Sequence, residues 1–294
     1  MIASLLMLLQ AAEEHHEDDL GTTIMHHVVD GHELELPGTV LHLPSWPAVE
    51  LGPFVIDFSP TKHAVFLLIT AVIVGAVMLY TARRAKQSGG ERVPGGFAGV
   101  IEAIVLYIRD NVVVANIGHG GEKYAPFVVT LFFFIWVANL LGLVPWGTSP
   151  TANISVTAAL AVMSLVVVEV AGMKALGLRG YSRTIFFWPH DMPLPMRLMM
   201  FVIMTPVELL GKFSKPFALA IRLFANMVAG KFVLYSLMGL IFVAAPLAGW
   251  VFPWLAPVLM SVAFLVLKLF VAVLQAYIFA MLTSVFIGLI RHAH

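Results

Sequence analysis

The chain has 294 residues, of which 60% are hydrophobic and 12% charged, and its mean hydropathy is +0.93. This composition excludes a disordered chain, a nucleic-acid-binding protein and most water-soluble enzymes. The formal net charge is zero, but residues 1–62 carry ten acids and one base, Lys62, which leaves seven acids and sixteen bases to the remainder. There is no cysteine, so disulfides, thiolate nucleophiles and Cys-bound metals are excluded as well.

Residues 1–62 form an acidic, His-rich segment ahead of the apolar part of the chain. Residues 1–12 have the apolar core and small residues of a secretory signal peptide but no basic residue, so cleavage and an uncleaved apolar end both stay open. Asp30-Gly31 lies between two alternating stretches of residues 24–36, which predicts a β-hairpin in a small external module. The histidines show no repeated tight ligand spacing, so we expect a solvated segment and no metal site. These histidines are His15, His16, His26, His27, His32 and His42.

Residues 63–294 are expected to be the membrane domain, with five transmembrane helices. The first is the uncharged run 64–82, and two more cover about 125–145 and 153–173. The last two are long helices joined by an uncharged turn at 244–257. Between the first and second spans, residues 99–114 carry apolar side chains at helical spacing, which predicts an amphipathic helix on the cytoplasmic surface.

The basic residues indicate the orientation of these spans. They follow the first, third and last spans, whereas the turns at 145–150 and 244–257 carry none. Because basic loops stay in the cytoplasm, we expect the N-terminus outside and the C-terminus inside. The fold class is therefore an all-α polytopic membrane protein with a small external segment.

Three cations lie inside the apolar runs of the last two helices: Arg222, Lys231 and Lys268. A cation at the bilayer centre costs at least about 2.5–3.5 kcal/mol, so it is normally functional or paired. Arg222 and Gln275 are nearly equidistant in sequence from Gly249 in the turn, and so are Lys231 and Lys268. An antiparallel hairpin should bring each pair to one depth, with the lysines roughly 13 Å nearer the outside than Arg222.

Each polar residue of this hairpin also has a purely structural interpretation. Arg222 could be satisfied by carbonyls and Gln275, while Asn226, one turn after Arg222, and Gln275 could join helices by hydrogen bonds. Small residues near Arg222 would let another helix approach closely. They are Ala218, Ala225, Ala229 and Gly230.

The two lysines could extend to the outer interface. They repel each other if both are charged, and an acid of residues 1–62, such as Glu50 or Asp57, could compensate them. Glu169, near the inner end of the third span, is either part of the site or an interfacial acid near Lys174.

The segment Arg222-Leu-Phe-Ala-Asn-Met resembles subunit a of the F-type ATP synthase, as do Pro206-Val-Glu-Leu-Leu and Leu274-Gln-Ala-Tyr-Ile-Phe. The segments that begin at Asn139 and Pro150 are similar to its middle hairpin, and the resemblance covers about residues 60–290. It implies two long tilted helices packed against a rotor ring of c subunits, with protons passing through two offset half-channels. It also implies a b-subunit peripheral stalk, the remaining synthase subunits and a bacterial inner membrane.

The resemblance also implies roles for single residues. Arg222 would be the essential stator arginine with Gln275 beside it, and Glu208 would match an acidic position near the cytoplasmic outlet. Lys231 and Lys268 occupy outer relay positions where the family commonly has an acid, a histidine or a small residue, so this chain departs from the usual relay residues there. Ala225 stands where the family usually has glycine.

Two other classes remain as alternatives. A self-contained secondary ion transporter should show inverted repeats and broken helices in both halves, and the sequence shows neither. A structural scaffold leaves Arg222 unexplained. Walker A, HExxH and GxSxG patterns are missing from the sequence, so we expect a non-catalytic subunit without a cofactor.

Overall fold

The computed structural model describes residues 33–36, 39–44, 49–51, 54–56, 59–87, 96–144, 147–186, 193–244 and 252–291. Five helical segments in these ranges are long and apolar enough to cross a membrane, which confirms the predicted number of spans and the all-α polytopic class. They correspond to the helices α2 (Lys62–Gln87), α5 (Ala125–Leu141), α6 (Ile154–Ile185), α7 (Leu194–Ala244) and α8 (Phe252–Arg291).

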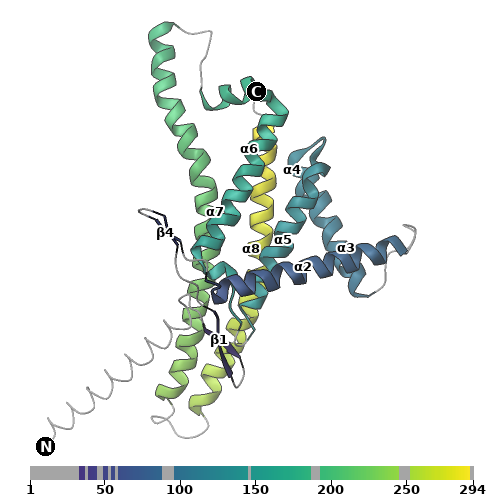
Figure 1. The fold of residues 1–294 in the computed structure, drawn as a ribbon, viewed down its shortest axis with the longest axis vertical. Coiled ribbons are helices and arrows are strands. Elements are labelled where there is room, and N and C mark those ends of the chain that lie inside the picture. Colours follow the sequence, from purple (N-terminus) through teal and green to yellow (C-terminus); the bar gives the residue numbers. More distant parts are fainter. Residues whose placement is uncertain are drawn as a thin grey trace, which may run out of the picture.

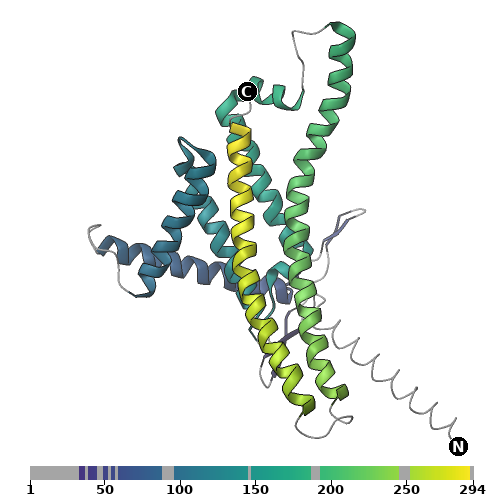
Figure 2. The same cartoon turned by 180° about the vertical axis from the view of Figure 1, so that it is seen from behind.

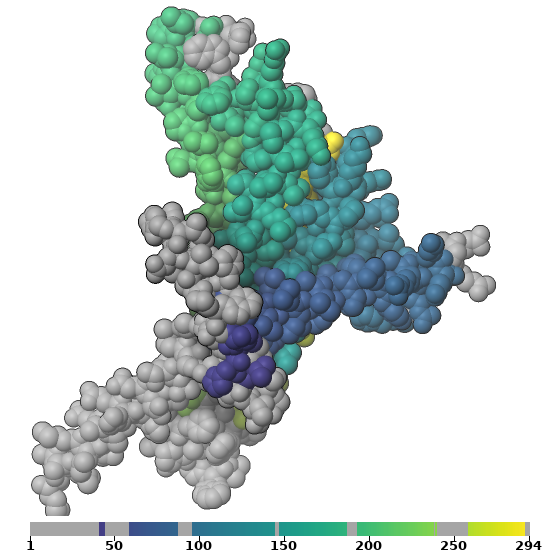
Figure 3. Space-filling model, viewed as in Figure 1, coloured from purple at the N-terminus to yellow at the C-terminus, as the bar shows by residue number. Residues whose placement is uncertain are grey.

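Helices α7 and α8 form a long antiparallel pair that organises the rest of the molecule (Figure 1). Helix α8 packs against α5, α6 and α7, and α6 also packs against α7. Helix α2 runs across the direction of α7 and α8, as the front and back views both show (Figures 1 and 2). In the space-filling view α6 covers the middle of the molecule beside α7, with α2 across its lower edge (Figure 3).

Local signals explain where these helices begin and bend. The Ala64 N–H donates to the Thr61 hydroxyl at 3.4 Å at the start of α2. The Asn153 side chain caps α6 by accepting from the Ser155 N–H at 2.8 Å. Gly177, with φ 70° and ψ 166°, interrupts α6 in a conformation that essentially only glycine adopts, and the helix bends there.

The amphipathic segment predicted at 99–114 is helical but more elaborate than expected. Helix α3 (Phe97–Tyr107) continues into a π-helical segment η1 (Ile108–Val114) and a short α4 (Ala115–Ile117). The predicted apolar face turns inward, and Ile108 and Val112 are fully buried. The segment η1 contacts α5 and α8, so protein covers this face.

Two antiparallel hairpins precede α2. Strand β1 (Glu33–Leu36) pairs with β2 (Thr39–His42), and β3 (Val49–Leu51) pairs with β4 (Phe54–Ile56). The predicted Asp30-Gly31 turn lies outside the described residues, as does the candidate signal 1–12. The described partner of β1 is β2, which follows it in the chain, so neither of the two described hairpins is the predicted one.

Candidate functional site

Arg222 lies on an exposed stripe of small residues along α7. Its side chain is exposed, and so are Ala218, Ala225 and Ala229, which share its face of the helix. Within the described ranges Arg222 forms no hydrogen bond or ion pair. An exposed cation beside small side chains in an apolar helix leaves room for a second helix to approach.

The two amides near Arg222 occupy different environments. Gln275 is buried, with 5% of its surface exposed, whereas Asn226 is half-buried. The Asn226 Nδ2 atom is buried and has no hydrogen-bond partner among the described residues. No hydrogen bond joins Arg222 to Gln275 in the part of the chain that the structure describes.

The lysine pair lies at one level of the α7–α8 hairpin. A Cβ atom added to Gly230 would lie 2.4 Å from Lys268 Cε and 2.7 Å from Lys268 Nζ, so the ammonium of Lys268 rests on the bare backbone of α7 beside Lys231. This contact agrees with the alignment predicted from the sequence. Lys231 and Lys268 are 5% and 8% exposed, and Lys62 at the start of α2 is a third cation near Lys231.

Acids that could compensate these lysines lie beyond what the structure describes. Asp57 and the side chain of Glu50 are outside the described part, and within it neither Lys231 nor Lys268 forms an ion pair. Both side chains are enclosed by protein. Compensation from residues 1–62 therefore stays a prediction.

A buried polar network connects the turn after α5 to α8. The Thr151 hydroxyl donates to Asn139 Oδ1 at 2.7 Å, and Ser149 Oγ lies 2.7 Å from Thr151 Oγ1. Asn139 Nδ2 donates to the Ala272 carbonyl at 3.5 Å, one turn from Lys268. The sequence analysis did not select Asn139, Ser149 or Thr151 as site residues, although polar residues in a long uncharged stretch were an available signal.

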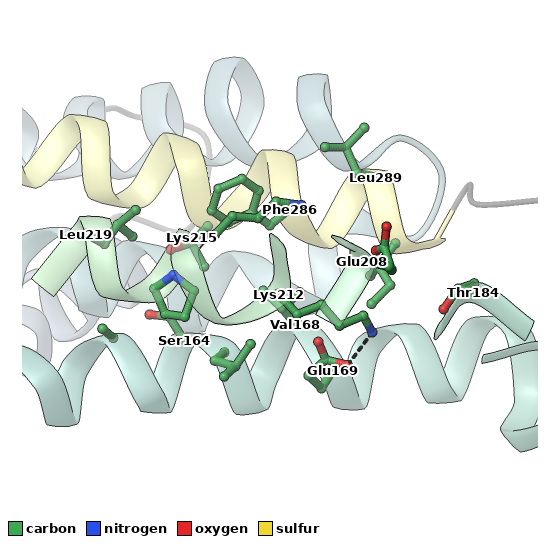
Figure 4. A pocket seen from close by; sticks show the side chains of 15 residues that line it. Ser164, Val168, Glu169, Thr184, Glu208, Lys212, Lys215, Leu219, Phe286 and Leu289 are labelled. Atoms are coloured by element: carbon green, nitrogen blue, oxygen red, sulfur yellow. Dashed lines mark hydrogen bonds and ion pairs between the residues drawn. The ribbon is translucent and has the colours of Figure 1, made fainter. Parts of the chain in front are cut away.

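A pocket with a cavity volume of about 130 Å³ lies on the other side of Arg222 from the lysine pair, between α6, α7 and the C-terminal part of α8 (Figure 4). Its wall is mostly apolar, with Leu219 and Phe286 among the lining residues. Four charged residues also line it: Glu169, Glu208, Lys212 and Lys215. The structure thus brings the two predicted acids to one pocket, away from the lysine pair.

The two acids in this pocket differ in their partners. Glu169 Oε2 accepts a hydrogen bond and ion pair from Lys212 Nζ at 3.2 Å, with side chains that are 20% and 12% exposed. The predicted alternative partner of Glu169 was Lys174, and the observed one is Lys212. Glu208 is exposed and forms no ion pair with any described residue.

Lys212 is held on a second side by Tyr181. Its Nζ donates to the Tyr181 hydroxyl at 2.9 Å and lies 4.3 Å from the centre of the Tyr181 ring. The sequence analysis missed Tyr181 and assigned Lys212 only to the cytoplasmic side. Their pairing links residues far apart in sequence, which spacing along one helix cannot reveal.

Comparison with known proteins identifies the family. The chain matches the family model described as ATP synthase A chain over residues 64–288. The chain belongs to this family. It is similar to the ATP synthase subunit a of Chloroherpeton thalassium, with 41% identity over 268 residues that cover 90% of this chain and 75% of that protein.

Other relatives give the same result. The ATP synthase subunit a 2 of Prosthecochloris aestuarii is 41% identical over 273 residues, covering 92% of this chain and 80% of that protein. The ATP synthase subunit a of Anaeromyxobacter dehalogenans is 38% identical over 291 residues, covering 94% and 72%. Together with the five apolar helices, these matches make the chain a multi-pass membrane protein of the ATP synthase subunit a family.

Proposed function

We propose that the chain is the proton-translocating stator subunit of an F-type ATP synthase, with two offset half-channels separated by Arg222. One observation carries the proposal: Arg222 is exposed on a stripe of small residues, between two polar regions on opposite sides of it along α7. A self-contained transporter would enclose its charged site rather than present it on an outer face.

The region around Lys231 and Lys268 would form the outer half-channel. Its polar groups continue toward Arg222 through Asn139, the Ser149–Thr151 hydroxyls and the buried Gln275. Buried polar groups at membrane depth need partners, and ordered water is the usual one where no side chain serves. Asn226 Nδ2, which has no hydrogen-bond partner among the described residues, is a donor for such a water or for a rotor group.

The pocket that contains Glu208 would form the inner half-channel. Here the exposed carboxylate of Glu208, which forms no ion pair with a described residue, lines a pocket that reaches Ile290, next to the basic Arg291. By the distribution of basic residues this side would be cytoplasmic, which puts the N-terminus outside and the chain in a bacterial inner membrane.

Arginine suits the position between the two half-channels. A rotor carboxyl must be neutral to face lipid and charged to exchange its proton, and a fixed cation favours the charged form. Arginine keeps its own proton, so it does not become a proton carrier. Protons would then have to travel on the c-subunit ring, while the b-subunit stalk holds this subunit still.

Replacing Arg222 tests the proposal. Arg222→Ala should abolish ATP-driven proton pumping in inverted membrane vesicles while the complex still assembles, because the exposed side chain forms no hydrogen bond or ion pair with a described residue. Arg222→Lys should not restore coupling, since lysine can lose its proton in a partly dry site. The control is Arg109→Ala, which removes an exposed arginine on η1 and should leave pumping intact. Normal pumping by the Arg222→Ala variant would refute the assignment.

A further inference from the structure

Lys212 does not form the ion pair that its position on the helix favours. Glu208 and Lys212 are four residues apart on α7 with the acid first, which is the favoured order for an ion pair along one helix. In the structure the Lys212 ammonium turns away and binds Glu169 on α6 (Figure 4). Glu208 lines the same pocket without an ion pair among the described residues.

Three contacts hold Lys212 in this orientation. The Glu169 carboxylate accepts at 3.2 Å, the Tyr181 hydroxyl accepts at 2.9 Å, and the Tyr181 ring lies 4.3 Å from the ammonium. A carboxylate, a hydroxyl and an aromatic face together satisfy a partly buried ammonium well. Tyr181 follows the bend at Gly177, so this bend is part of what brings it to Lys212.

Of the two lysines that line the pocket, Lys212 is the one that lies one helical turn from Glu208 on α7. Lys215, the second pocket lysine, lies 5.2 Å from the Phe286 ring centre on α8. The remaining polar lining consists of hydroxyls, which are Ser164, Thr184 and Thr283. Glu169 and Glu208 therefore compete for Lys212. Which of the two binds the ammonium decides whether a cation lies next to the Glu208 carboxylate.

We propose that Glu169 and Tyr181 are positioning residues that hold the Lys212 ammonium away from Glu208, which keeps Glu208 free to exchange protons at the inner mouth. The inference rests on the proposed function and gives Glu169 a role other than proton relay. Without Glu169, Lys212 would pair with Glu208 along α7 and hold it in its charged form, so proton exchange there would slow.

Second-site rescue tests this inference. Glu169→Gln should slow ATP-driven pumping in inverted vesicles about twofold to fivefold, the range expected for a new ion pair of partly exposed groups. Tyr181→Phe, which keeps the ring but removes the hydroxyl, should have a smaller effect in the same direction. The double variant Glu169→Gln/Lys212→Gln should pump faster than Glu169→Gln alone, because no lysine remains to pair with Glu208. Rates are compared at equal amounts of assembled complex.

A purely structural ion pair predicts no rescue in the double variant. If Glu169 and Lys212 only hold α6 to α7, the double variant should be as slow as the single one, and both should melt at similarly lowered temperatures. That result would overturn the inference, as would unchanged pumping by Glu169→Gln. If Glu208→Gln pumps normally, Glu208 is not the exchanging group, and this inference fails while the Arg222 test of the proposed function is unaffected.

Discussion

Three cations of α7 are accommodated in three different ways. Arg222 points outward from a stripe of small residues, Lys212 is paired with Glu169, and Lys231 is enclosed beside Lys268. An uncompensated cation inside an apolar helix costs several kcal/mol, so each of these cations needs favourable interactions that offset the cost. Lys212 does so within the chain, whereas Arg222 needs a partner outside it.

Gly230 gives the Lys268 ammonium its place against α7. In Gly230→Ala the new Cβ would overlap the end of the Lys268 side chain, at 2.4 Å from Cε and 2.7 Å from Nζ. Because this end is flexible, we expect the lysine to move rather than the helices to separate. Proton flux from the outer side should fall, while the melting temperature of the complex changes little.

Two variants decide whether the Gly230 effect acts through Lys268. Gly230→Ala/Lys268→Ala removes the overlapping atoms, so Gly230→Ala should add no further loss in that background. Gly211→Ala, in the same helix with no atom within 4 Å of the new Cβ, is the matched control and should behave like the unaltered protein. Equal losses from Gly230→Ala with and without Lys268 would contradict this explanation.

The sequence predicts single site residues better than their contacts. Arg222, Lys231 and Lys268 stand out because they interrupt long apolar runs. Their equal spacing about Gly249 predicted that Lys231 and Lys268 lie at the same level of the hairpin, as the contact of Lys268 with Gly230 shows. The Glu169–Lys212 pair joins residues 43 positions apart on two helices and depends on how each helix is rotated. Gln275 is buried while Arg222 is exposed, and this difference also depends on how each helix is rotated about its axis. The equal spacing about Gly249 predicts only how deep each residue lies, not which way it points.

At the scale of the helices, hydropathy and basic residues predicted the five spans because lipid requires each span to be long, apolar and helical. The same rules say little about irregular backbone. The π-helical segment η1 and the bend at Gly177 arise from local backbone geometry within helical sequence, so periodicity did not reveal them. The β3–β4 hairpin was missed because its strands have only three residues each.

Gly288 allows α8 to approach α4 so closely that the two backbones are in contact. A Cβ at this position would lie 2.1 Å from the Asn116 carbonyl oxygen, and backbone cannot move aside as a lysine tip can. Gly288→Ala should therefore destabilise the complex by about 1–3 kcal/mol, the usual cost of overpacking. Thermal melting of the purified complex measures this. Gly75→Ala on α2, where the new Cβ meets nothing within 4 Å, should melt like the parent, and equal melting of both variants would contradict the close approach.

At the scale of the whole molecule, large apolar side chains remain exposed on both α7 and α8. Examples are Phe217, Ile221, Leu259, Val266 and Phe270. Such surfaces are covered by lipid or by another protein in a membrane assembly. Beside them on α7, Arg222 and its small neighbours form the stripe that we assign to the rotor ring, because small residues permit helix approach and a lipid surface would not satisfy the guanidinium.

The assignment of this stripe to the rotor predicts that bulk at Ala225 blocks rotation without damaging the fold. Ala225 is exposed, so Ala225→Trp should leave the internal packing of this subunit intact. Packed helices typically lie about 8–10 Å apart, and an indole ring between stator and rotor would exceed that space. ATP-driven pumping should be lost at normal complex assembly. Leu79→Trp adds bulk to an exposed position on α2 and should leave pumping unchanged. Normal pumping by Ala225→Trp would place the rotor elsewhere, and Arg222 would then need a partner other than a rotor carboxylate.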